Sequence, residues 1–376
     1  MTARRILLVG GGHSHVEVLR RFAEVPEPGV DLTLVSPDAL TPYSGMLPGL
    51  VAGHYTHAEA HIDLPPLAQR AGARWLRDTV AGVDLGDRRA QLARHPPETF
   101  DLLSLDIGST PDMSVAGAHA NAIGVKPVAG FLDAWAAIQD DAANERINTV
   151  AVVGGGAGGL EILLAMQHRL AALLGAGAPR FAIVTDTPHL LPQHAPSVRR
   201  RIGRILVARD VVVHLDARAV AVEPGNVVVA DGRRIAAERI VWATAAAAQP
   251  WVGAAGLACD PRGFMRMDEY LRSVSHPFVF GAGDCAAQDA HPRPKSGVYA
   301  VRQGPPLATN LRRAARGETP VAFVPQRSAL ALISTGDRHA IASRGAFAVE
   351  GDWVWRWKDR IDRGFMAKYR DHGAPR

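Results

Sequence analysis

Two glycine-rich segments of the same design constrain this chain more than any other feature. The first reads RRILLVGGGHSHVEVLRRF over residues 4–22, and the second reads TVAVVGGGAGGLEILLA over residues 149–165. In each, a short apolar run ends at glycines and is followed by residues with the 3.6-residue apolar period of a helix. A second β-rich run follows each helix, VDLTLVSP from residue 30 and RFAIVTD from residue 180. Each segment therefore predicts a β-α-β unit with glycines in its first turn.

Glycines at such a turn place the N-terminus of a helix, with its free N–H groups, beneath a pyrophosphate. Gly10 would permit the tight turn and Gly12 would let phosphates approach the backbone. The second copy holds a full G-x-G-x-x-G pattern, and both copies run on to a similar closing strand, FDLLSLDIGS at 100–109 and ERIVWATAA at 238–246. One such pattern is weak, because glycine-rich turns are common. Two copies in equivalent settings predict two dinucleotide sites.

The first copy departs from the pattern because His15 stands where the third glycine is expected. We therefore expect its helix to lie slightly further from its strand. His13 and His15 are either helix-start histidines without chemistry, or one of them donates to a phosphate or ribose. The second strands end in Ser36 and Thr185 rather than in an acid, so they do not separate NADH from NADPH. Asp186, one residue later, favours NADH.

Composition excludes several other classes of protein. The net charge of +5 comes almost entirely from arginine, without blocks of like charge, so nucleic-acid binding is not predicted. Cys259 and Cys285 have no C-x-x-C spacing, which favours a reducing compartment. The apolar run near the N-terminus is too short for a signal peptide, and no run approaches 18 apolar residues. We expect a cytoplasmic protein of two domains. Only four lysines occur, Lys126, Lys295, Lys358 and Lys368.

A strand at LRSVSHPFVFGAGDCAA (271–287), ending in Gly-x-Gly-Asp at Asp284, resembles the flavin-binding strand of the two-dinucleotide-binding-domain flavoproteins, the pyridine nucleotide-disulfide oxidoreductase superfamily. The resemblance covers most of the chain through GGGH (10–13), LDIGS (105–109), GGGAGG (154–159), WATA (242–245) and GAGDC (281–285). It implies that the first glycine turn holds FAD and the second NADH or NADPH. It also implies that Asp284 bonds the ribityl chain.

Within that superfamily, the chain is similar to type II NADH dehydrogenases and to the oxidoreductases fused N-terminal to selenide water dikinase. The shared segments are TPYSGMLPGLVAGHY (41–55), VKPVAGFLDAW (125–135), RPKSGVYAVRQGPPLATNL (293–311) and WRWKDRIDRGFM (355–366). The resemblance implies an α/β fold with two Rossmann-like domains and a small C-terminal α+β cap. The expected boundaries are 1–115 and 246–325 for the split FAD domain, 116–245 for the NAD(P)H domain and 326–376 for the cap.

The expected function is FAD-dependent oxidation of NAD(P)H, with electrons passed to a quinone-like or other small acceptor and without redox cysteines. One alternative is a flavin- and nucleotide-binding accessory protein of selenium metabolism with little turnover, whose partner is selenide water dikinase. Another is a thiol- or selenide-linked oxidoreductase that uses Cys285. We expect Cys285 to pack as a small buried residue and Cys259 to have no partner, which argues against the thiol route.

Hydride transfer to a flavin needs ring stacking more than it needs side-chain chemistry. Lys295 and Tyr43 are expected to act through positioning and flavin electrostatics, and the helix that starts at Ser296 or Gly297 would direct its N-terminus at the ring. The alternatives are a solvated surface role for Lys295 and an ordinary loop anchor for Tyr43. The expected FAD site is Gly10, Gly12, His13, His15, Ser36, Pro37, Met46, Leu47, Val80, Ile107, Gly108, Gly283, Asp284, Ser296, Gly297 and Val298. The expected NAD(P)H site is Gly154, Gly156, Gly158, Gly159, Glu161, Thr185, Asp186, Thr244 and Ala245.

The acceptor site is expected at Tyr299 and Arg302. Type II dehydrogenases hold quinone partly through an Ala-Gln…Gln stretch, and the aligned residues here are Gly297, Val298 and Arg302. Because the glutamine pair is absent, the sequence leaves the acceptor open. Arg302 would either meet an anionic acceptor or form a surface salt bridge.

Two further segments carry local predictions. His54, His57 and His61 would share a helical face, but no carboxylate or cysteine is spaced to complete a metal site, so no metal is predicted. We expect His54 and Tyr55 to pack near the active-site loop and the other two histidines to be solvated.

At the C-terminus, alternation of Trp353, Trp355 and Trp357 predicts a hairpin strand, followed from Lys358 by a helix. Its apolar residues are Ile361, Phe365 and Tyr369, and Arg356, Arg360, Arg363 and Arg370 lie on the other side. The relatives attach to the inner membrane surface through this region. In this protein the C-terminal segment would attach to a membrane surface, cap the core or form a homodimer.

Overall fold

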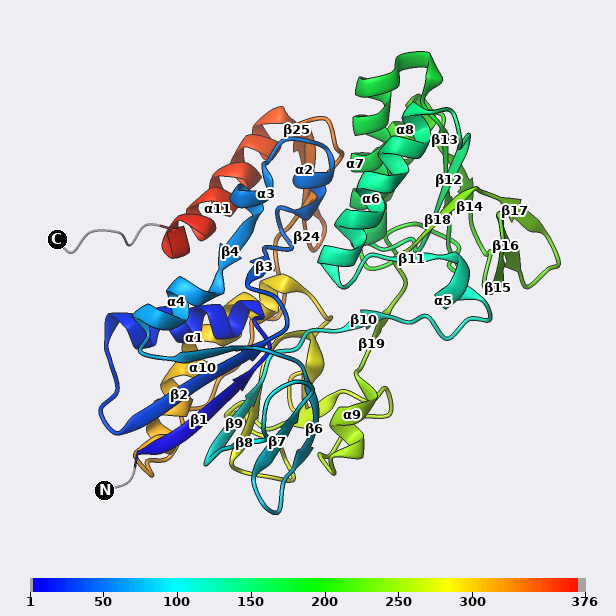
Figure 1. Ribbon diagram of the computed structural model, residues 1–376. Helices are drawn as coiled ribbons and strands as arrows, with labels where there is room; N and C mark the ends of the chain where they lie inside the picture. Colours follow the sequence, from blue (N-terminus) through cyan, green and yellow to red (C-terminus); the bar gives the residue numbers. More distant parts are fainter. Residues whose placement is uncertain (1–2, 371–376) are drawn as a thin grey trace.

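The computed structural model describes residues 3–370 and contains two α/β units joined by two short crossings (Figure 1). The first unit is built on a parallel sheet in the order β21-β9-β1-β2-β5. Its strands are β1 (Arg4–Val9), β2 (Val30–Ser36), β5 (Arg74–Arg77), β9 (Leu102–Leu105) and β21 (Val279–Gly281). After its first two residues β1 is buried throughout, because helices and a second sheet cover the two faces of the sheet.

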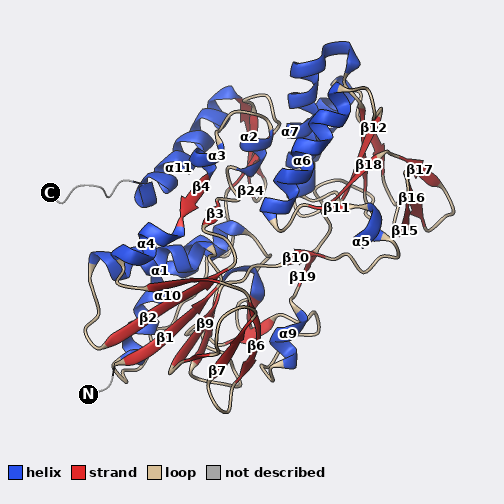
Figure 2. Cartoon of the chain, in the orientation of Figure 1, coloured by secondary structure: helices blue, strands red, loops and turns tan. Residues whose placement is uncertain are grey.

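Helices cover one face of this first sheet (Figure 2). They are α1 (His13–Glu24), α4 (Leu64–Arg70) and α10 (Gly297–Ala315). The opposite face carries an antiparallel sheet of β6 (Val80–Asp84), β7 (Arg89–Leu92) and β8 (Glu98–Thr99), with α9 (Pro250–Ala254) beside it. The 3-10 turn Gly283–Cys285 follows β21 and leads into β22 (Ala286–Gln288), which pairs parallel with β20 (Met265–Met267).

The second unit repeats the plan with a parallel sheet in the order β11-β18-β12-β13-β14. Its strands are β11 (Ile123–Gly124), β12 (Thr149–Val153), β13 (Arg180–Val184), β14 (Val212–His214) and β18 (Arg239–Trp242). Its helices are α5 (Ala118–Asn121), α6 (Val128–Ala143), α7 (Ala157–Leu174) and α8 (Pro196–Ala208), with a 3-10 turn at Gly175–Gly177. A small antiparallel sheet is formed by β15 (Ala219–Glu223), β16 (Asn226–Val229) and β17 (Arg234–Ala236).

The chain passes between the units at β10 (Thr110–Pro111) and β19 (Ala246–Ala247), which pair antiparallel to each other. These crossings flank the predicted 116–245 domain; the exact domain boundaries stay predictions. Residues 40–63 of the first unit form an excursion with β3 (Leu40–Pro42), α2 (Leu47–Val51), α3 (His57–Ala60) and β4 (His61–Asp63). This excursion reaches the second unit, because Leu47 and Val51 belong to the hydrophobic core around α7.

The C-terminal segment lies against both units. It contains the antiparallel strands β23 (Ala331–Ser334), β24 (Ala340–Arg344) and β25 (Phe347–Gly351), followed by α11 (Asp352–Arg370). Ile333 and Ile341 join the core of the second unit, whereas Phe365, Met366 and Tyr369 join the core of the first. The end of the predicted 326–376 cap, residues 371–376, lies outside the described residues.

The tryptophan hairpin predicted at the C-terminus is wrong. Strand β25 ends at Gly351, whose φ of +150° breaks the strand, and α11 is continuous from Asp352. Trp353 and Trp357 are therefore neighbours one helical turn apart with stacked rings, and Trp355 lies on another face against His54. The first and third of these aromatics also lie four residues apart, so a run this short is compatible with a helix as well as with a strand, and the glycine decided between them.

The shared helical face predicted for three histidines is also wrong, because α3 spans only His57–Ala60. His54 precedes it and bonds to the carbonyl oxygen of Gly336 at 2.7 Å. The rings of His57 and His61 stack at 3.8 Å, and His61 is buried rather than solvated. Tyr55 is buried as expected, and its hydroxyl donates to Asp359 at 2.8 Å.

None of the helices within residues 3–370 combines the length and the apolar character needed to cross a bilayer.

Candidate functional site

The first glycine turn requires bare backbone for measurable reasons. Gly10 has a φ of +92°, and a Cβ there would lie 2.4 Å from the carbonyl oxygen of Asp106. Gly12 is the N-cap of α1, and a Cβ there would lie 2.3 Å from the Asp106 carboxyl carbon. The turn between β1 and α1 is thus held against the end of β9, and neither glycine places a side chain of its own at the N-terminus of α1.

His15 fills the space that a third glycine would leave open. Its Nδ1 pairs with the carbonyl oxygen of Gly10 at 2.7 Å, and its Nε2 pairs with Ser104 Oγ at 2.8 Å. Burial lowers the pKa of His15 to about 4, so the ring is neutral at physiological pH. Both ring nitrogens are engaged inside the protein, which assigns the side chain to packing and leaves only its backbone N–H for an anion.

Asp106 stands at the N-terminus of α1, where the sequence analysis placed no acid. Its carboxylate accepts the backbone N–H of Ser14 at 2.8 Å and that of His15 at 3.1 Å. The side chain is buried, and this desolvation raises its pKa to about 7 despite the two hydrogen bonds; the nearby Asp284 raises it further. A carboxyl group therefore occupies the position of an anion at this helix end.

Asp284 lies in the 3-10 turn after β21, as the motif predicts. Its Oδ2 accepts from Lys126 Nζ at 2.9 Å and from Ser109 Oγ at 3.2 Å. Gly283 precedes it with a φ of +68°, and its N–H donates to Gln303 Oε1 at 2.7 Å. Lys126 comes from the segment before α6, so this ion pair links the first unit to the start of the second.

Helix α10 begins beside this turn, as predicted. Ser296 is its N-cap and accepts the N–H of Val298 at 3.4 Å, and Gly297 is its first residue. Lys295 Nζ donates to the carbonyl oxygen of Ala286 at 2.5 Å and lies 4.0 Å from the ring centre of Phe264. Burial lowers the pKa of Lys295, so a solvated surface role does not describe it.

Tyr43 is packed between residues of α1 and α11. Its ring stacks on Phe365 of α11 at 4.3 Å and meets the ring of His13 edge-on at 5.5 Å. Burial and the carboxylate of Asp362 raise the pKa of Tyr43. Burial lowers the pKa of His13 to about 4. These contacts exceed those of an ordinary loop anchor, and they bring the C-terminal helix to the start of α1.

Lys358 of α11 connects this loop to the second unit. Its Nζ donates to the carbonyl oxygen of Gly45 and to Asp362 Oδ2, both at 2.5 Å. Its charge also opposes the rise in the pKa of Glu161, which burial brings to about 7. Glu161, expected in the NAD(P)H site, accepts the N–H of Ser334 at 2.8 Å.

The second glycine turn has the full pattern. Gly154 has a φ of +132°, and a Cβ there would lie 2.2 Å from the carbonyl oxygen of Ala243. Gly156 is the N-cap of α7, and a Cβ there would meet nothing within 4 Å, which leaves open space at the helix N-terminus. A Cβ on Gly159 would lie 2.2 Å from the carbonyl oxygen of Gly154, so this glycine sets the close packing of helix on strand.

Residues expected near the ribose have local partners. Thr185 Oγ1 pairs with Thr187 Oγ1 at 2.9 Å, and Ser36 Oγ donates to the carbonyl oxygen of Asp38 at 3.1 Å. Asp186 is exposed beside Thr185.

The other residues expected at the cofactors divide between surface and core. Pro37, Gly108, Gly158, Thr244 and Ala245 lie in loops or at the start of α7 and are at least partly exposed. Ile107 is half-buried and packs against the core of the first unit. Met46 and Val80 are buried in that core, and Leu47 is buried in the core of the second unit.

The two expected acceptor residues face different hollows. Tyr299 lines a small pocket with Gly283, Asp284 and Lys295. Arg302, three residues along α10, lines a separate groove with Phe365 and Tyr369 of α11. The structure therefore does not bring Tyr299 and Arg302 into one pocket.

The thiol of Cys285 is buried, and burial raises its pKa to about 12. Its Sγ donates to the carbonyl oxygen of Ala282 at 3.1 Å. Cys259, the other free cysteine, hydrogen-bonds to Leu257. The expected packing role of Cys285 is confirmed. A reactive thiol needs a low pKa and access to solvent, and Cys285 has neither.

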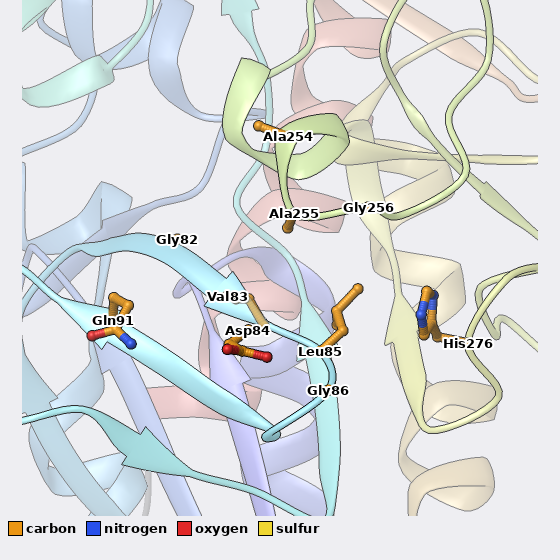
Figure 3. Close-up of a pocket in the computed structure, with 10 residues that line it drawn as sticks. All are labelled: Gly82, Val83, Asp84, Leu85, Gly86, Gln91, Ala254, Ala255, Gly256 and His276. Atoms are coloured by element: carbon orange, nitrogen blue, oxygen red, sulfur yellow. The ribbon is translucent and has the colours of Figure 1, made fainter.

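A larger hollow lies at the far end of the first unit, between the β6–β7 hairpin and α9 (Figure 3). Asp84 and His276 are its polar side chains together with Gln91, and the rest of the lining is mostly glycine and alanine. None of the ten residues lining it was predicted for a cofactor or acceptor. The described residues also contain no cluster of acidic, histidine or cysteine side chains able to hold a metal ion.

Four residues around the site were not predicted from the sequence: Lys126, Asp106, Lys358 and Asp362. A signal existed for the two lysines, because lysine is scarce in this arginine-rich chain and the same scarcity had singled out Lys295. For Asp106 the signal was an acid within LDIGS, at the end of a buried strand. Asp362 gave none, because only the packing of α11 places it beside Tyr43.

FAD fits the first turn, because Gly10 and Gly12 keep their own side chains out of it and α1 begins there with N–H groups that can hold an anion, as they hold the Asp106 carboxyl group in this structure. The family model for pyridine nucleotide-disulphide oxidoreductase matches residues 4–304. The chain belongs to this family. Membership confirms the predicted family, the α/β fold and an oxidoreductase class that works with FAD and a nicotinamide.

Relatives with related names support this placement. An NADH dehydrogenase-like protein of Mycobacterium tuberculosis is 28% identical over 60% of this chain and 58% of its own length. The type II NADH:quinone oxidoreductase NdhA of the same organism is 29% identical over 61% of this chain and 52% of its own length. This chain therefore matches little more than half of the length of each of these two relatives.

The fold is similar to that of the sulfide:quinone oxidoreductase from Aquifex aeolicus. The TM-score is 0.82 at 16% identity, and the match covers 98% of this chain and 92% of that one. At this identity the comparison speaks for the fold alone.

Proposed function

We propose that this protein oxidises NADH or NADPH and passes the electrons through FAD to a quinone-like or other small acceptor, without redox-active cysteines. When bound, FAD accepts a hydride from the nicotinamide and returns electrons to the acceptor. The names of the two mycobacterial relatives support the donor and the class of acceptor.

The observation that carries the proposal is the linkage of the two glycine turns through α11. Lys358 of α11 bonds to the loop of the first unit at Gly45, and α11 also packs on β23, whose Ser334 N–H donates to Glu161 in the first turns of α7. Phe365 from the same helix stacks on Tyr43, which lies beside His13 at the start of α1. One helix thus ties the surroundings of both nucleotide sites together, as ring stacking between two cofactors requires.

The chain's own groups supply positive potential around the first site. The N-terminus of α1 would hold the diphosphate, and that of α10 would face the ring system. At the same turn the charge of Lys126 is paired with Asp284, so the cation that adds to this potential is Lys295, which donates to the Ala286 carbonyl. We propose that these charges stabilise negative charge on the cofactor, while Tyr43 and Phe365 exclude water from it.

Two hollows along α10 are candidates for the acceptor. The groove at Arg302 is lined partly by aromatic residues of α11, which suits an apolar ring, and Arg302 itself suits an anionic group. At the positions of the glutamine pair of type II dehydrogenases, this chain has Val298, which is exposed at the start of α10, and Arg302. The neighbouring Gln303 is buried, and its side chain accepts the N–H of Gly283. We propose the Arg302 groove as the acceptor site.

The test is anaerobic addition of NADH, and separately of NADPH, to the FAD-loaded protein. We expect the flavin absorbance to bleach with at least one of them, and a soluble quinone to restore it more completely than disulfides do. Cys285→Ser serves as the control variant and is expected to keep full activity, because its thiol is buried and protonated. If neither nucleotide bleaches the flavin, the proposal is wrong. If the Cys285 variant loses activity, a mechanism that uses this thiol has to be considered again.

The same experiment also tests the alternative role as an accessory protein in selenium metabolism. If the flavin bleaches but none of the quinones, disulfides or other soluble acceptors restores it, electron transfer is not the main activity. Binding of selenide water dikinase would then be measured directly.

We further propose peripheral membrane contact through α11. Trp353, Trp357 and Ile361 follow each other at four-residue spacing and are 51%, 40% and 45% exposed, with exposed Arg356 and Arg360 beside them. An aromatic stripe flanked by arginines suits an anionic lipid surface.

Replacing both tryptophans, Trp353→Ser with Trp357→Ser, is expected to weaken sedimentation with phosphatidylglycerol vesicles by roughly tenfold or more. Val25→Ser with Val207→Ser is the control, because both valines are exposed but lie on other elements. Equal binding by the two double variants would rule out α11 as the attachment surface. If loss of the tryptophans instead dissociated a dimer, the stripe would be a subunit interface.

A further inference from the structure

We propose that Asp106 is a built-in occupant of the anion position in the first glycine turn, and that the protein takes up one proton on Asp106 when FAD binds. This concerns loading of the cofactor and is independent of the acceptor in the proposed function.

The geometry places the carboxyl group where a diphosphate would bind. Its Oδ2 accepts the N–H groups of Ser14 and His15, in the first turn of α1, at 2.8 and 3.1 Å. These are among the unpaired amides that give a helix N-terminus its affinity for phosphate. The carboxyl also fills space left by two missing side chains, because a Cβ on Gly12 or on Gly283 would lie 2.3 or 2.4 Å from it.

The charges around Asp106 do not compensate a diphosphate placed beside it. From the turn after β21 it is faced by the acid Asp284, whose charge is already paired with Lys126, and by the buried thiol of Cys285. From α1 it is faced by His15, whose backbone N–H donates to it and whose ring is neutral because burial lowers its pKa to about 4. Lys295 donates to the carbonyl oxygen of Ala286 rather than to Asp106. Within residues 3–370, arginine and lysine side chains make no direct hydrogen bond or ion pair with Asp106.

A proton resolves this conflict. An ionised Asp106 would share α1 with two phosphate charges, and it would repel them in a site of low dielectric constant. A protonated carboxyl keeps one oxygen as acceptor for Ser14 and turns the other into a donor for a phosphate oxygen. Rotation into solvent is the competing solution, but the side chain is only 3% exposed. Burial already raises the pKa of Asp106 to about 7, so the proton is accessible near neutral pH.

The sign of the pH dependence follows from linkage. Below pH 7 the carboxyl is already protonated and FAD affinity is flat. Above pH 7 binding must take up a proton, so the Kd for FAD rises by about tenfold per pH unit, or about 100-fold between pH 7.5 and 9.5. We measure it by diluting the FAD-loaded full chain at each pH and reading the fluorescence of free FAD at equilibrium.

Asp106→Asn is expected to abolish this slope, because the amide both accepts from Ser14 and donates to a phosphate at every pH. At pH 9.5, about 2.5 units above the pKa, this variant should bind FAD about 300-fold more tightly than the unchanged protein. Asp289→Asn is the control and should keep the slope, because Asp289 lies on the surface in an ion pair with Arg266. A flat Kd in the unchanged protein, or an unchanged slope in the Asp106 variant, overturns the proposal.

A second measurement needs no variant. Calorimetry of FAD binding to the stripped full chain at pH 8, in two buffers of different ionisation enthalpy, should show uptake of about one proton per FAD. Uptake of none overturns the proposal. Turnover of NADH is assayed separately, so an enzyme that is active but shows no proton uptake contradicts only this inference. A protein with proton uptake but no bleaching contradicts only the proposed function.

Discussion

Gly156→Val is expected to leave the protein folded and loaded with FAD, yet to raise the KM for NADH at least about 100-fold. A Cβ at Gly156 meets nothing within 4 Å, and its extended backbone suits valine, so the free protein tolerates the change. The side chain would occupy the space at the N-terminus of α7 that the nicotinamide diphosphate needs. Loss of two charged hydrogen bonds at about 1.5–3 kcal/mol each gives that magnitude.

The matched control is Gly203→Val in α8, where a Cβ likewise meets nothing within 4 Å but no nucleotide site is expected. Both variants should unfold at urea concentrations close to that of the unchanged protein, and only Gly156→Val should lose NADH binding in stopped-flow bleaching. An unchanged KM in Gly156→Val would mean that the second turn does not hold the nicotinamide nucleotide.

Asp284→Ala is expected to weaken FAD binding by about 10- to 100-fold. The carboxylate is mostly buried and is held by Lys126 and Ser109, and by resemblance to the family it bonds the ribityl chain. Its removal deletes charged hydrogen bonds of about 1.5–3 kcal/mol and leaves the lysine without its partner at the site. The measurement is the FAD Kd from dilution of the loaded protein at pH 7.

Two further variants show whether the loss of FAD binding comes from Asp284 itself. Asp289→Ala removes a surface carboxylate with an exposed partner, Arg266, and is expected to leave the FAD Kd unchanged. Lys126→Met separates the two roles of Asp284. A small effect of this variant beside a large effect of Asp284→Ala places the carboxylate in direct contact with FAD, whereas equal effects make it a support for Lys126. Normal FAD binding by Asp284→Ala would contradict the assignment of this turn.

The lysines illustrate how tertiary structure gathers residues that are far apart in the chain. Lys126 and Lys295 reach the turn around Gly283–Cys285, and Lys358 reaches the loop at Gly45. Arginine serves the surface ion pairs of this protein, while these three lysines each donate to a carbonyl or carboxylate at partly or fully buried positions. A compact ammonium fits such positions better than a planar guanidinium.

The two β-α-β units, their glycine turns and the turn that carries Asp284 could all be predicted from the amino-acid order. The reason is that these features are local: apolar period, bare backbone and a helix N-terminus are written in consecutive residues. The amino-acid order also indicated burial of Cys285 and the start of α10 at Ser296.

The residues that fill those turns and the segments that connect them became known from the packing of the folded chain. His15 became a packing residue because Ser104, 89 positions away, meets its ring. Asp106 became the anion at α1 because β9 ends beside β1. The C-terminal tryptophans entered a helix after Gly351, and that helix brought Lys358 and Phe365 to both units. Contacts between distant segments depend on how sheets and helices pack, and the period of a short segment does not contain that information.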